Sequence, residues 1–477
     1  MKSIFLVNSI SGQGHLDSYA RLYARAFLEI GYRVTLVAAT DGGTSEYLTR
    51  NKIDQSSFAF VPFSAPARIS EQDVARAGLS AVQRMLLVWK EESAAGLLRR
   101  LVVVPVRAAR RLVPESVHDK WRKLKQTFSS QLAQIPAARA LRQFLFPDAG
   151  RILFITLLRH VQKAASISGG KPPDLVFFLY LDLMAEGPSN VAALDRIGGW
   201  PWAGIRFHPK LRGSSDAGIE RYFESRTARG GVFLVPDAAD IYAKAVPRLK
   251  FLLVPDVADL ELASELPPVA KQIRERAAGR TIILQIGTIA PHKGVMPLLD
   301  VISKADPQRF FFAMVGEVYW QNFGGDERRL RNFYAQPPEN VVVYDGYMAD
   351  ERDYNSLVAA CDVIYAVYSG FNSSSNSLTK AAGLQRPILA AKNSLMGERV
   401  QAHGIGMVAT SNDANDILAA LERFALGKAD AFGFESYAHQ HSLDQLKSVL
   451  SEGLPLWLAG PRASESIDPT SPSRIGV

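Results

Sequence analysis

The sequence predicts an α/β protein made of two doubly wound, Rossmann-like domains, and three observations predict it. The chain has 477 residues and is therefore too long for a single hydrophobic core. This length fits two domains of roughly 200 residues each. Short apolar runs alternate with amphipathic stretches, as strands and helices do in parallel sheets. A turn containing glycine follows an apolar strand at 8–15 and again at 287–294, so the β-turn-α pattern begins anew in the second half.

The composition is that of a folded enzyme without a membrane span. Hydrophobic residues make up 47% of the chain and charged residues 21%. The one cysteine, Cys361, excludes a disulfide framework and a cysteine metal cluster, and it favours a reducing compartment. The sequence has no run of 18 apolar residues, and its N-terminal apolar run is too short for a signal peptide. We therefore expect a cytoplasmic protein.

Positive charge is concentrated in one segment. Residues 84–164 hold 16 Lys/Arg against 5 Asp/Glu, whereas the net charge of the whole chain is only +8. The surrounding stretch 70–168 reads as a basic helical insertion interrupted by prolines. In 97–112, cations alternate with apolar residues at helical spacing, which suits an anionic membrane surface, so we expect peripheral attachment to the inner face of the cell membrane. Helices packed on the sheet with a solvated basic face are the alternative; nucleic acid is not expected, because aromatics are sparse.

The first half, predicted as a domain over 1–255, opens with a strand at 2–7 and a turn containing Gly12 and Gly14. This turn lacks the third glycine of a dinucleotide site. A helix starting near His15 follows it. Further strands are expected at 32–39, 58–63, 175–181, 201–207, 232–235 and 251–254. His208 follows one of these strands at its carboxyl end, where ligands gather in open α/β sheets.

A predicted linker at 255–259 leads into the second half, which is predicted as a domain over 256–430 with most of this linker included. Strands are expected at 281–286, 310–315, 341–344, 363–367 and 387–390, and helices at 295–303, 357–360, 375–384, 418–424 and 442–450. Helices in 431–458 are expected to return to the first domain, and the polar tail 459–477 is expected to lack fixed structure.

A loop of small polar residues joins the strand at 363–367 to the following helix. It contains Gly370, Phe371, Asn372 and Ser373, and Asn376 lies where the helix begins. A strand, a small-residue loop and a helix N-terminus together offer backbone N–H groups and a positive helix end to an anion. A solvated loop with an N-cap is the other interpretation.

Several segments resemble one family in their order and spacing. They are SGQGHLDSYARLYARAFLEIGYRVTLVAA, LVPDVADLE, IGTIAPHKGVMPLLDVI, AACDVIYAVYS and KAAGLQRPILA. Together they resemble the GT-B glycosyltransferases, and within these the retaining enzymes of family 4. The likeness is good over 250–425, fair over 1–50 and 170–255, and absent over 70–168.

The resemblance implies transfer of a sugar from a nucleotide-sugar donor to a saccharide acceptor, without a metal or other cofactor. We expect the acceptor to be lipid-linked and part of surface polysaccharide synthesis, which the basic segment motivates. Lys293 occupies the position of the family's phosphate-binding lysine, and Gly287 and Gly316 end strands at the donor site. Gly12 and Gly14 would approach the diphosphate. His208 occupies the position of a histidine beside the transferred sugar.

The chain departs from the family pattern at the donor site. Thr288 stands where the family has an arginine, and Asn372 and Lys380 stand where it has two glutamates. Lys380 has no acceptor for a ribose hydroxyl, so it would contact a phosphate, a carboxylate or a nearby acid. Alternatively the loop is shifted and Asn376 serves the ribose. Two other functions stay open: an inverting GT-B enzyme that uses His15, and a non-catalytic relative.

Overall fold

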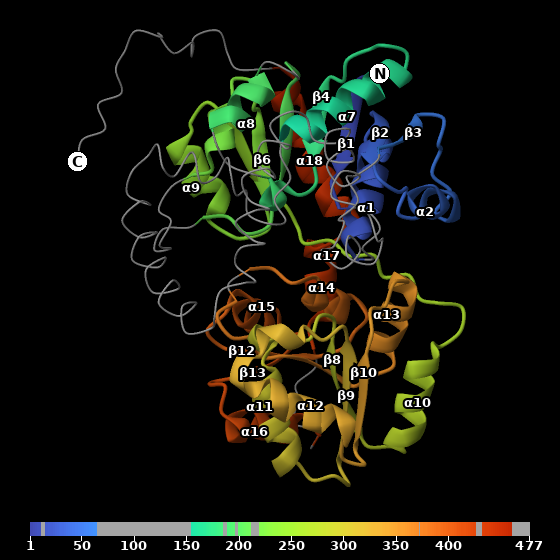
Figure 1. The fold of residues 1–477 in the computed structure, drawn as a ribbon, viewed down its shortest axis with the longest axis vertical. Coiled ribbons are helices and arrows are strands. Elements are labelled where there is room, and N and C mark those ends of the chain that lie inside the picture. The colour runs from blue at the N-terminus through green and yellow to red at the C-terminus, as the bar shows by residue number, and fades with distance from the viewer. Residues whose placement is uncertain are drawn as a thin grey trace, which may run out of the picture.

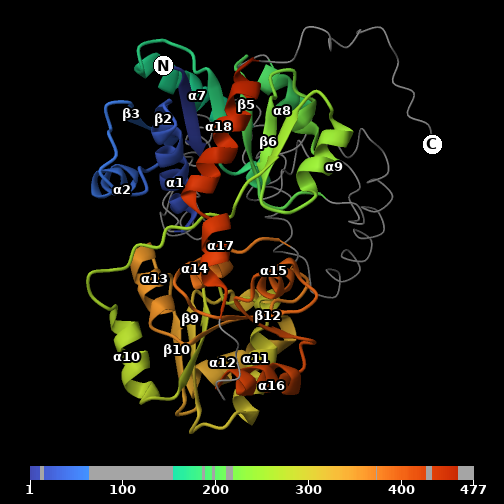
Figure 2. The same ribbon diagram turned by 180° about the vertical axis from the view of Figure 1, so that it is seen from behind.

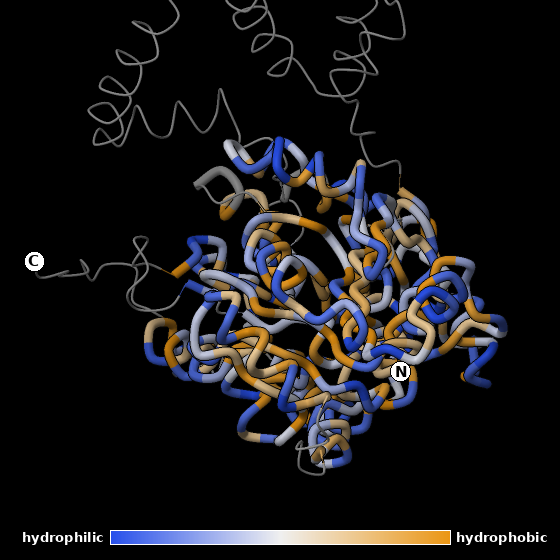
Figure 3. The backbone as a smooth tube through the Cα atoms, turned by 90° about the horizontal axis from the view of Figure 1, so that it is seen from below, coloured by the Kyte–Doolittle hydropathy of each residue, from blue (hydrophilic) through white to orange (hydrophobic). Residues whose placement is uncertain are grey.

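The protein folds as two α/β domains, one above the other (Figure 1). The computed structural model describes residues 1–10, 15–63, 154–184, 188–195, 199–210, 219–371, 373–425 and 432–459. Seen along its long axis, hydrophobic segments gather in the interior and hydrophilic ones at the rim (Figure 3). In this part of the chain, no helix combines the length and apolar character needed to cross a membrane.

The N-domain is built on a seven-stranded parallel sheet in the order β3-β2-β1-β4-β5-β6-β7. Its strands are β1 (Ser3–Asn8), β2 (Arg33–Ala38), β3 (Phe58–Pro62), β4 (Leu175–Phe178), β5 (Trp202–Arg206), β6 (Gly230–Phe233) and β7 (Lys250–Leu253). Its helices are α1 (His15–Glu29), α2 (Thr44–Arg50), α7 (Phe154–Ile167), α8 (Pro188–Ala193) and α9 (Ala238–Ala245). The strand order reverses between β1 and β4, so the carboxyl ends of these two strands form a topological switch point, a place where ligands bind in open α/β sheets.

The C-domain is built on a six-stranded parallel sheet in the order β10-β9-β8-β11-β12-β13. Its strands are β8 (Thr281–Ile286), β9 (Phe310–Gly316), β10 (Val341–Asp345), β11 (Val363–Ala366), β12 (Ile388–Ala391) and β13 (Gly406–Ala409). Its helices are α10 (Pro268–Ala277), α11 (Val295–Lys304), α12 (Glu327–Ala335), α13 (Glu351–Ala359), α14 (Asn376–Gly383), α15 (Leu395–His403) and α16 (Ala414–Ala425).

Both faces of the C-domain sheet are covered. Along β8, Ile282, Leu284 and Ile286 pack into one core cluster, while Ile283 packs into another on the opposite face. Side chains alternate between the faces of a strand, so buried apolar residues on both faces of β8 indicate a sheet that is covered on both sides. This confirms the predicted fold class of two Rossmann-like, doubly wound domains.

Part of the predicted insertion belongs to the N-domain. Residues 154–167 form α7, and its apolar residues Leu157, Val161 and Ala164 are buried in the core of that domain. Arg159 and Lys163 on the same helix are exposed. Residues 64–153, which hold most of the basic segment, lie outside the described residues. The predicted tail lies outside them from residue 460.

The chain crosses from one domain to the other twice. After β7 it enters the C-domain, and after α17 (Phe434–Gln440) it returns as α18 (Leu443–Ala459), which runs up the N-domain (Figure 2). The α18 residues Leu446, Leu450, Leu454 and Trp457 are buried in the N-domain core. The Trp457 indole Nε1 donates to the Lys250 carbonyl oxygen at 2.9 Å. The last helix is therefore part of the N-domain.

Candidate functional site

A pocket opens where three parallel strands of the C-domain end. The turns after β8, β9 and β10 line it with Gly287, Gly316 and Gly346, and it has about 490 Å³ of empty volume including open solvent. The remaining lining residues are Ile286, Thr288, Val315, Glu317, Tyr347, Met348, Glu351, Tyr354 and Lys380. Glycines at strand ends let a ligand approach the backbone closely.

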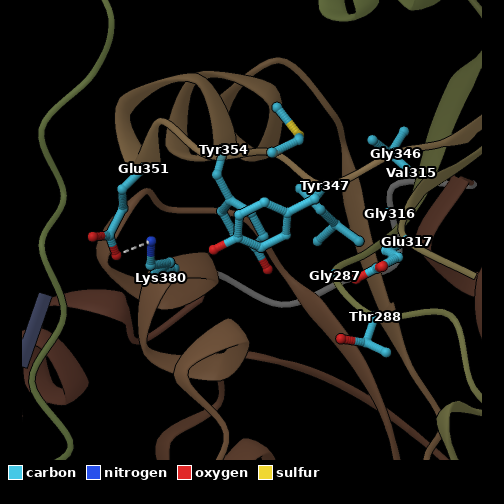
Figure 4. Close-up of a pocket in the computed structure, with 12 residues that line it drawn as sticks. Gly287, Thr288, Val315, Gly316, Glu317, Gly346, Tyr347, Glu351, Tyr354 and Lys380 are labelled. Carbon is cyan, nitrogen blue, oxygen red and sulfur yellow. Dashed lines mark ion pairs between the residues drawn. The ribbon is translucent and has the colours of Figure 1, made fainter. Parts of the chain in front are cut away.

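A buried ion pair forms one wall of this pocket. Lys380 Nζ lies 2.6 Å from Glu351 Oε1 and donates to Asn355 Oδ1 at 2.8 Å. Figure 4 shows the lysine amine turned toward the carboxylate, with the rings of Tyr354 and Tyr347 between this pair and the glycine turns. The amine also lies 4.6 Å from the centre of the Tyr354 ring. Burial lowers the pKa of Lys380, and the Glu351 carboxylate counteracts this shift.

The same carboxylate reaches the N-domain. Arg21, on α1, contacts Glu351 Oε2, and its Nη2 lies 3.3 Å from Asp259 Oδ2 in the linker. The Arg21 side chain is 11% exposed and that of Glu351 only 5%. Burial raises the pKa of Asp259, with Glu351 adding to the effect. Two cations thus hold one pocket carboxylate, and one of them comes from the other domain.

The loop of residues 367–375, here the Ser/Asn loop, lies against the N-domain. His208 Nδ1 is 2.8 Å from Ser373 Oγ. The next residue, Ser374, donates to Asp256 Oδ2, and Asp256 Oδ1 accepts from the Tyr19 hydroxyl at 2.7 Å. Burial raises the pKa of Asp256. The loop therefore brings the predicted His208 and Ser373 together across the domain junction.

A second polar contact braces this loop. Arg399, on α15, donates to Ser374 Oγ and to the Leu234 carbonyl oxygen at the end of β6, the latter at 2.6 Å. Asn376, the alternative ribose residue, is not among the residues that line the pocket, and its Nδ2 donates to the Val257 carbonyl oxygen at 3.3 Å. Asn376 thus ties α14 to the linker.

The turn that carries Lys293 has a backbone that only glycine adopts readily. Gly294 has a φ of 70°, and a Cβ there would lie 2.1 Å from the Val367 carbonyl oxygen. The Tyr365 hydroxyl donates to the Gly294 carbonyl oxygen at 2.9 Å. Lys293 Nζ lies 4.1 Å from the centre of the Tyr368 ring. This turn is therefore packed directly against the Ser/Asn loop, with α11 starting behind it.

The predicted residues fall into two groups. Gly287, Thr288, Gly316 and Lys380 line the pocket. Gly370, Phe371 and Ser373 belong to the Ser/Asn loop, where Gly370 has a φ of 65°. Lys293 and His208 lie against this loop, near Phe371 and Ser373 respectively. Of the three possible partners expected for Lys380, the structure contains the nearby acid. Gly12, Gly14 and Asn372 lie outside the described residues, as does the side chain of His15, whose backbone begins α1.

Glu351, Tyr347 and Tyr354 were not predicted as pocket residues. A signal was available for Glu351, because it follows the N-cap Asp350 soon after the strand β10, and strand ends at one edge of a sheet converge. The described residues contain no group of three His, Cys, Asp or Glu side chains arranged to hold a metal ion.

Comparison with known proteins shows the fold. No family model and no curated protein matches the chain. Among solved structures, sucrose-phosphate synthase from Thermosynechococcus elongatus is similar with a TM-score of 0.56 at 12% identity, covering 96% of this chain and all of that one. This chain has the GT-B fold.

Two further structures with the GT-B fold agree with this. HepE from Anabaena, in complex with UDP-glucose, is similar with a TM-score of 0.56 at 12% identity over 95% of this chain and 100% of that chain. WaaG, a glycosyltransferase involved in lipopolysaccharide biosynthesis, has a TM-score of 0.51 at 12% identity over 96% of this chain and 100% of that chain. The described pocket therefore lies in the C-domain of a GT-B fold.

Proposed function

We propose that the protein is a glycosyltransferase that moves a sugar from a nucleotide-sugar donor to a saccharide acceptor. The observation that carries the proposal is the pocket at the ends of β8, β9 and β10, with its glycine turns and buried Lys380–Glu351 pair. It occurs in a GT-B fold, and the similar HepE is described in complex with UDP-glucose.

In this proposal the nucleoside of the donor occupies the pocket. The base lies against the turn of residues 346–348, where the half-exposed Tyr347 ring offers a stacking surface. The ribose hydroxyls donate to Glu351. A carboxylate has about four lone-pair positions, so its contacts with Arg21 and Lys380 leave acceptor capacity. Glu351 would thus supply the carboxylate that the family pattern has at the position of Lys380.

The diphosphate would lie between the pocket and the Ser/Asn loop. Lys293 supplies a cation there, and α11 begins directly after it, so backbone N–H groups and the positive helix end favour an anion. Fixed donors of this kind stabilise the charge that develops on a leaving diphosphate. His208 would contact the transferred sugar, and the product would retain the donor's anomeric configuration.

The nucleotide-sugar class can be tested directly by a thermal-shift screen of the full chain against UDP-, GDP-, ADP- and dTDP-sugars. We expect the sugars of one nucleotide to raise the melting temperature of the wild-type protein. The same ligands should not raise the melting temperature of Glu351→Ala. The anomeric configuration of the product, determined by NMR, then distinguishes retention from inversion. Activity should persist in EDTA, because the proposal assigns no metal. A folded protein that neither binds nor hydrolyses any of these donors would contradict the proposal.

The acceptor is proposed to be a lipid-linked saccharide of a surface polysaccharide, with the enzyme peripheral to the inner face of the cell membrane. The basic segment 84–164 supports this part. The wild-type protein should float with anionic liposomes in low salt. A variant with Arg107→Gln, Arg110→Gln and Arg111→Gln should float less. Equal flotation of both proteins would contradict membrane attachment through this segment.

Two other candidates have specific support. A non-catalytic GT-B relative is favoured by Thr288 and by the pairing of Lys380 with Glu351, since both depart from the family's donor site. An inverting enzyme is favoured by His15 at the start of α1. In the inverting case His15→Ala, not His208→Ala, would abolish transfer, and the product would have the opposite anomeric configuration.

A further inference from the structure

A network of charged side chains surrounds the strand end that carries His208. Asp182 follows β4, in the short helical turn Leu181–Leu183, and β4 pairs with β5. Its carboxylate accepts from two consecutive backbone N–H groups: Oδ2 from Phe207 and Oδ1 from His208, each at 2.8 Å. One side chain thus fixes the direction in which the chain leaves β5.

The network continues on the other side of Asp182. Arg206 Nη1 lies 3.2 Å from Asp182 Oδ1, and Arg206 Nε lies 3.0 Å from Glu220 Oε1. The Tyr242 hydroxyl donates to Glu220 Oε2 at 2.6 Å. The oxygen of the same Tyr242 hydroxyl accepts from the Lys210 backbone N–H at 2.9 Å. The segment 207–210 is therefore held at both of its ends.

The charges in this network are buried. The exposed fractions are 14% for the Asp182 side chain, 11% for Arg206 and 0% for Glu220. Burying charges is unfavourable, and a buried ion pair adds little to stability compared with apolar residues of the same volume. Such a network does fix geometry, because charged hydrogen bonds are short and directional. His208 itself is exposed and faces Ser373 of the C-domain.

We propose that Asp182 is a positioning residue that sets the place of the His208 imidazole against the Ser/Asn loop. Its backbone contacts fix Phe207 and His208, and the contact with Arg206 orients the carboxylate. Its effect on turnover rests on the proposed glycosyltransferase function. Its effect on the imidazole does not.

The test compares Asp182→Ala and Asp182→Asn with Asp195→Asn in the full chain. Asp195 is a matched control: its side chain is also 14% exposed, and its Oδ1 accepts from the Arg226 backbone N–H at 2.8 Å, away from His208. The first readout is the NMR signal of the His208 Cε1–H group, identified by its loss in His208→Gln. We expect this signal to shift in Asp182→Ala, to shift less in Asp182→Asn and to stay in place in Asp195→Asn.

The second readout is a double-mutant cycle on transfer. If Asp182 acts through His208, Asp182→Ala lowers kcat by roughly tenfold or more and changes the donor KM by less than about threefold. Asp182→Ala combined with His208→Ala then has the kcat of His208→Ala alone. An unmoved His208 signal, or losses that multiply in the double variant, would overturn the inference. If wild-type protein transfers no sugar, the proposed function fails while the NMR comparison still decides the role of Asp182; Asp182→Asn serves both readouts if Asp182→Ala does not fold.

Discussion

Lys380 stands where the family-4 pattern that the sequence resembles has a glutamate, yet the pocket keeps a buried carboxylate, that of Glu351. The charge at 380 is reversed, and Glu351 on α13 lies beside it at ion-pair distance. Arg21 also contacts Glu351, and Asn355 accepts from Lys380. The Nδ2 of Asn355 donates to the Asp259 carbonyl oxygen at 3.0 Å. A substitution that looks incompatible with donor binding is thus matched by a neighbour.

This pairing predicts that Lys380→Met destabilises the protein. Methionine fills the space but leaves a buried carboxylate with one cation fewer, and breaking a buried ion pair costs about 3 kcal/mol or more. The free energy of unfolding of the C-domain should fall by that amount in urea denaturation. Lys304→Met is the control, because Lys304 is exposed on α11. Equal stability of the two variants would contradict the structural role of the pair.

Lys293 is predicted to bind the diphosphate of the donor and to make no contact with the nucleoside. In Lys293→Ala the affinity for the nucleoside diphosphate should fall about 10- to 100-fold, the usual value of a hydrogen bond to a charged group. The affinity for the nucleoside without phosphate should stay within about twofold. Calorimetry of both ligands measures the difference, with Lys392→Ala, an exposed lysine after β12, as control. Parallel loss of both affinities would place Lys293 elsewhere than at the phosphates.

At the scale of elements, the sequence predicted most strands because each is a continuous apolar run between turn residues. The helices α2, α9, α10, α12 and α15 and the strand β13 were missed. Only Leu330 is buried on α12, so that helix has too thin an apolar stripe to be recognised. β13 is an edge strand with three half-buried residues, which weakens its apolar pattern. α10, with Ala270, Ile273 and Ala277 buried, does show helical spacing and could have been found.

The candidate site was predicted less completely than the strands. Residues at strand ends, such as Gly287 and Gly316, could be placed because parallel strands end at one edge. The contact between Arg21 and Glu351 could not be predicted, because these two residues are 330 positions apart in the sequence and belong to different domains. Long-range charge pairing has no local periodicity from which to predict it.

The junction of α17 and α18 predicts a pH dependence of stability. His441 Nδ1 accepts from the Asp256 backbone N–H at 3.1 Å, and its ring stacks on Tyr437 with 4.1 Å between centroids. Burial, with Arg399 adding to it, lowers the pKa of His441 to about 3. The unfolded chain takes up this proton near pH 6.5 and the folded chain does not, so stability is lost as pH falls below about 6.5.

Between pH 7.5 and 5.5 the wild-type protein should therefore lose about 1 kcal/mol more stability than His441→Asn, in which this titration is absent. Urea denaturation at both pH values measures the difference. His439→Asn, at an exposed position two residues earlier, should retain the wild-type slope. If His441→Asn retains it as well, the imidazole does not titrate on unfolding as proposed.

At the scale of the whole molecule, the two domains share buried charges. Arg21 on α1 contacts Glu351 and Asp259, both outside the N-domain sheet. In Arg21→Met those two carboxylates lose a cation, which should loosen the domains relative to each other. Limited proteolysis should then cut the linker 255–259 several times faster than in wild type.

The matched control for this change is Arg25→Met on the same helix. Arg25 pairs with Glu29 at 2.8 Å and donates to Asn51 Oδ1 at 2.8 Å, both within the N-domain. Linker cleavage at the wild-type rate is expected there. Faster cleavage in both variants would mean that α1 itself is destabilised, and not the contact between the domains.

The two crossings of the chain between the domains touch each other, at the bond from Asp256 to His441. Two separated crossings would define an axis of rotation, whereas two crossings in contact act as one short pivot. Ser374 binds the same Asp256 side chain, and Ser373 next to it faces His208. A swing about this pivot moves the outer rims of the domains much farther than it moves these residues. Under the proposed function, such an opening would admit an acceptor at the rim while the imidazole and the Ser/Asn loop stay close together.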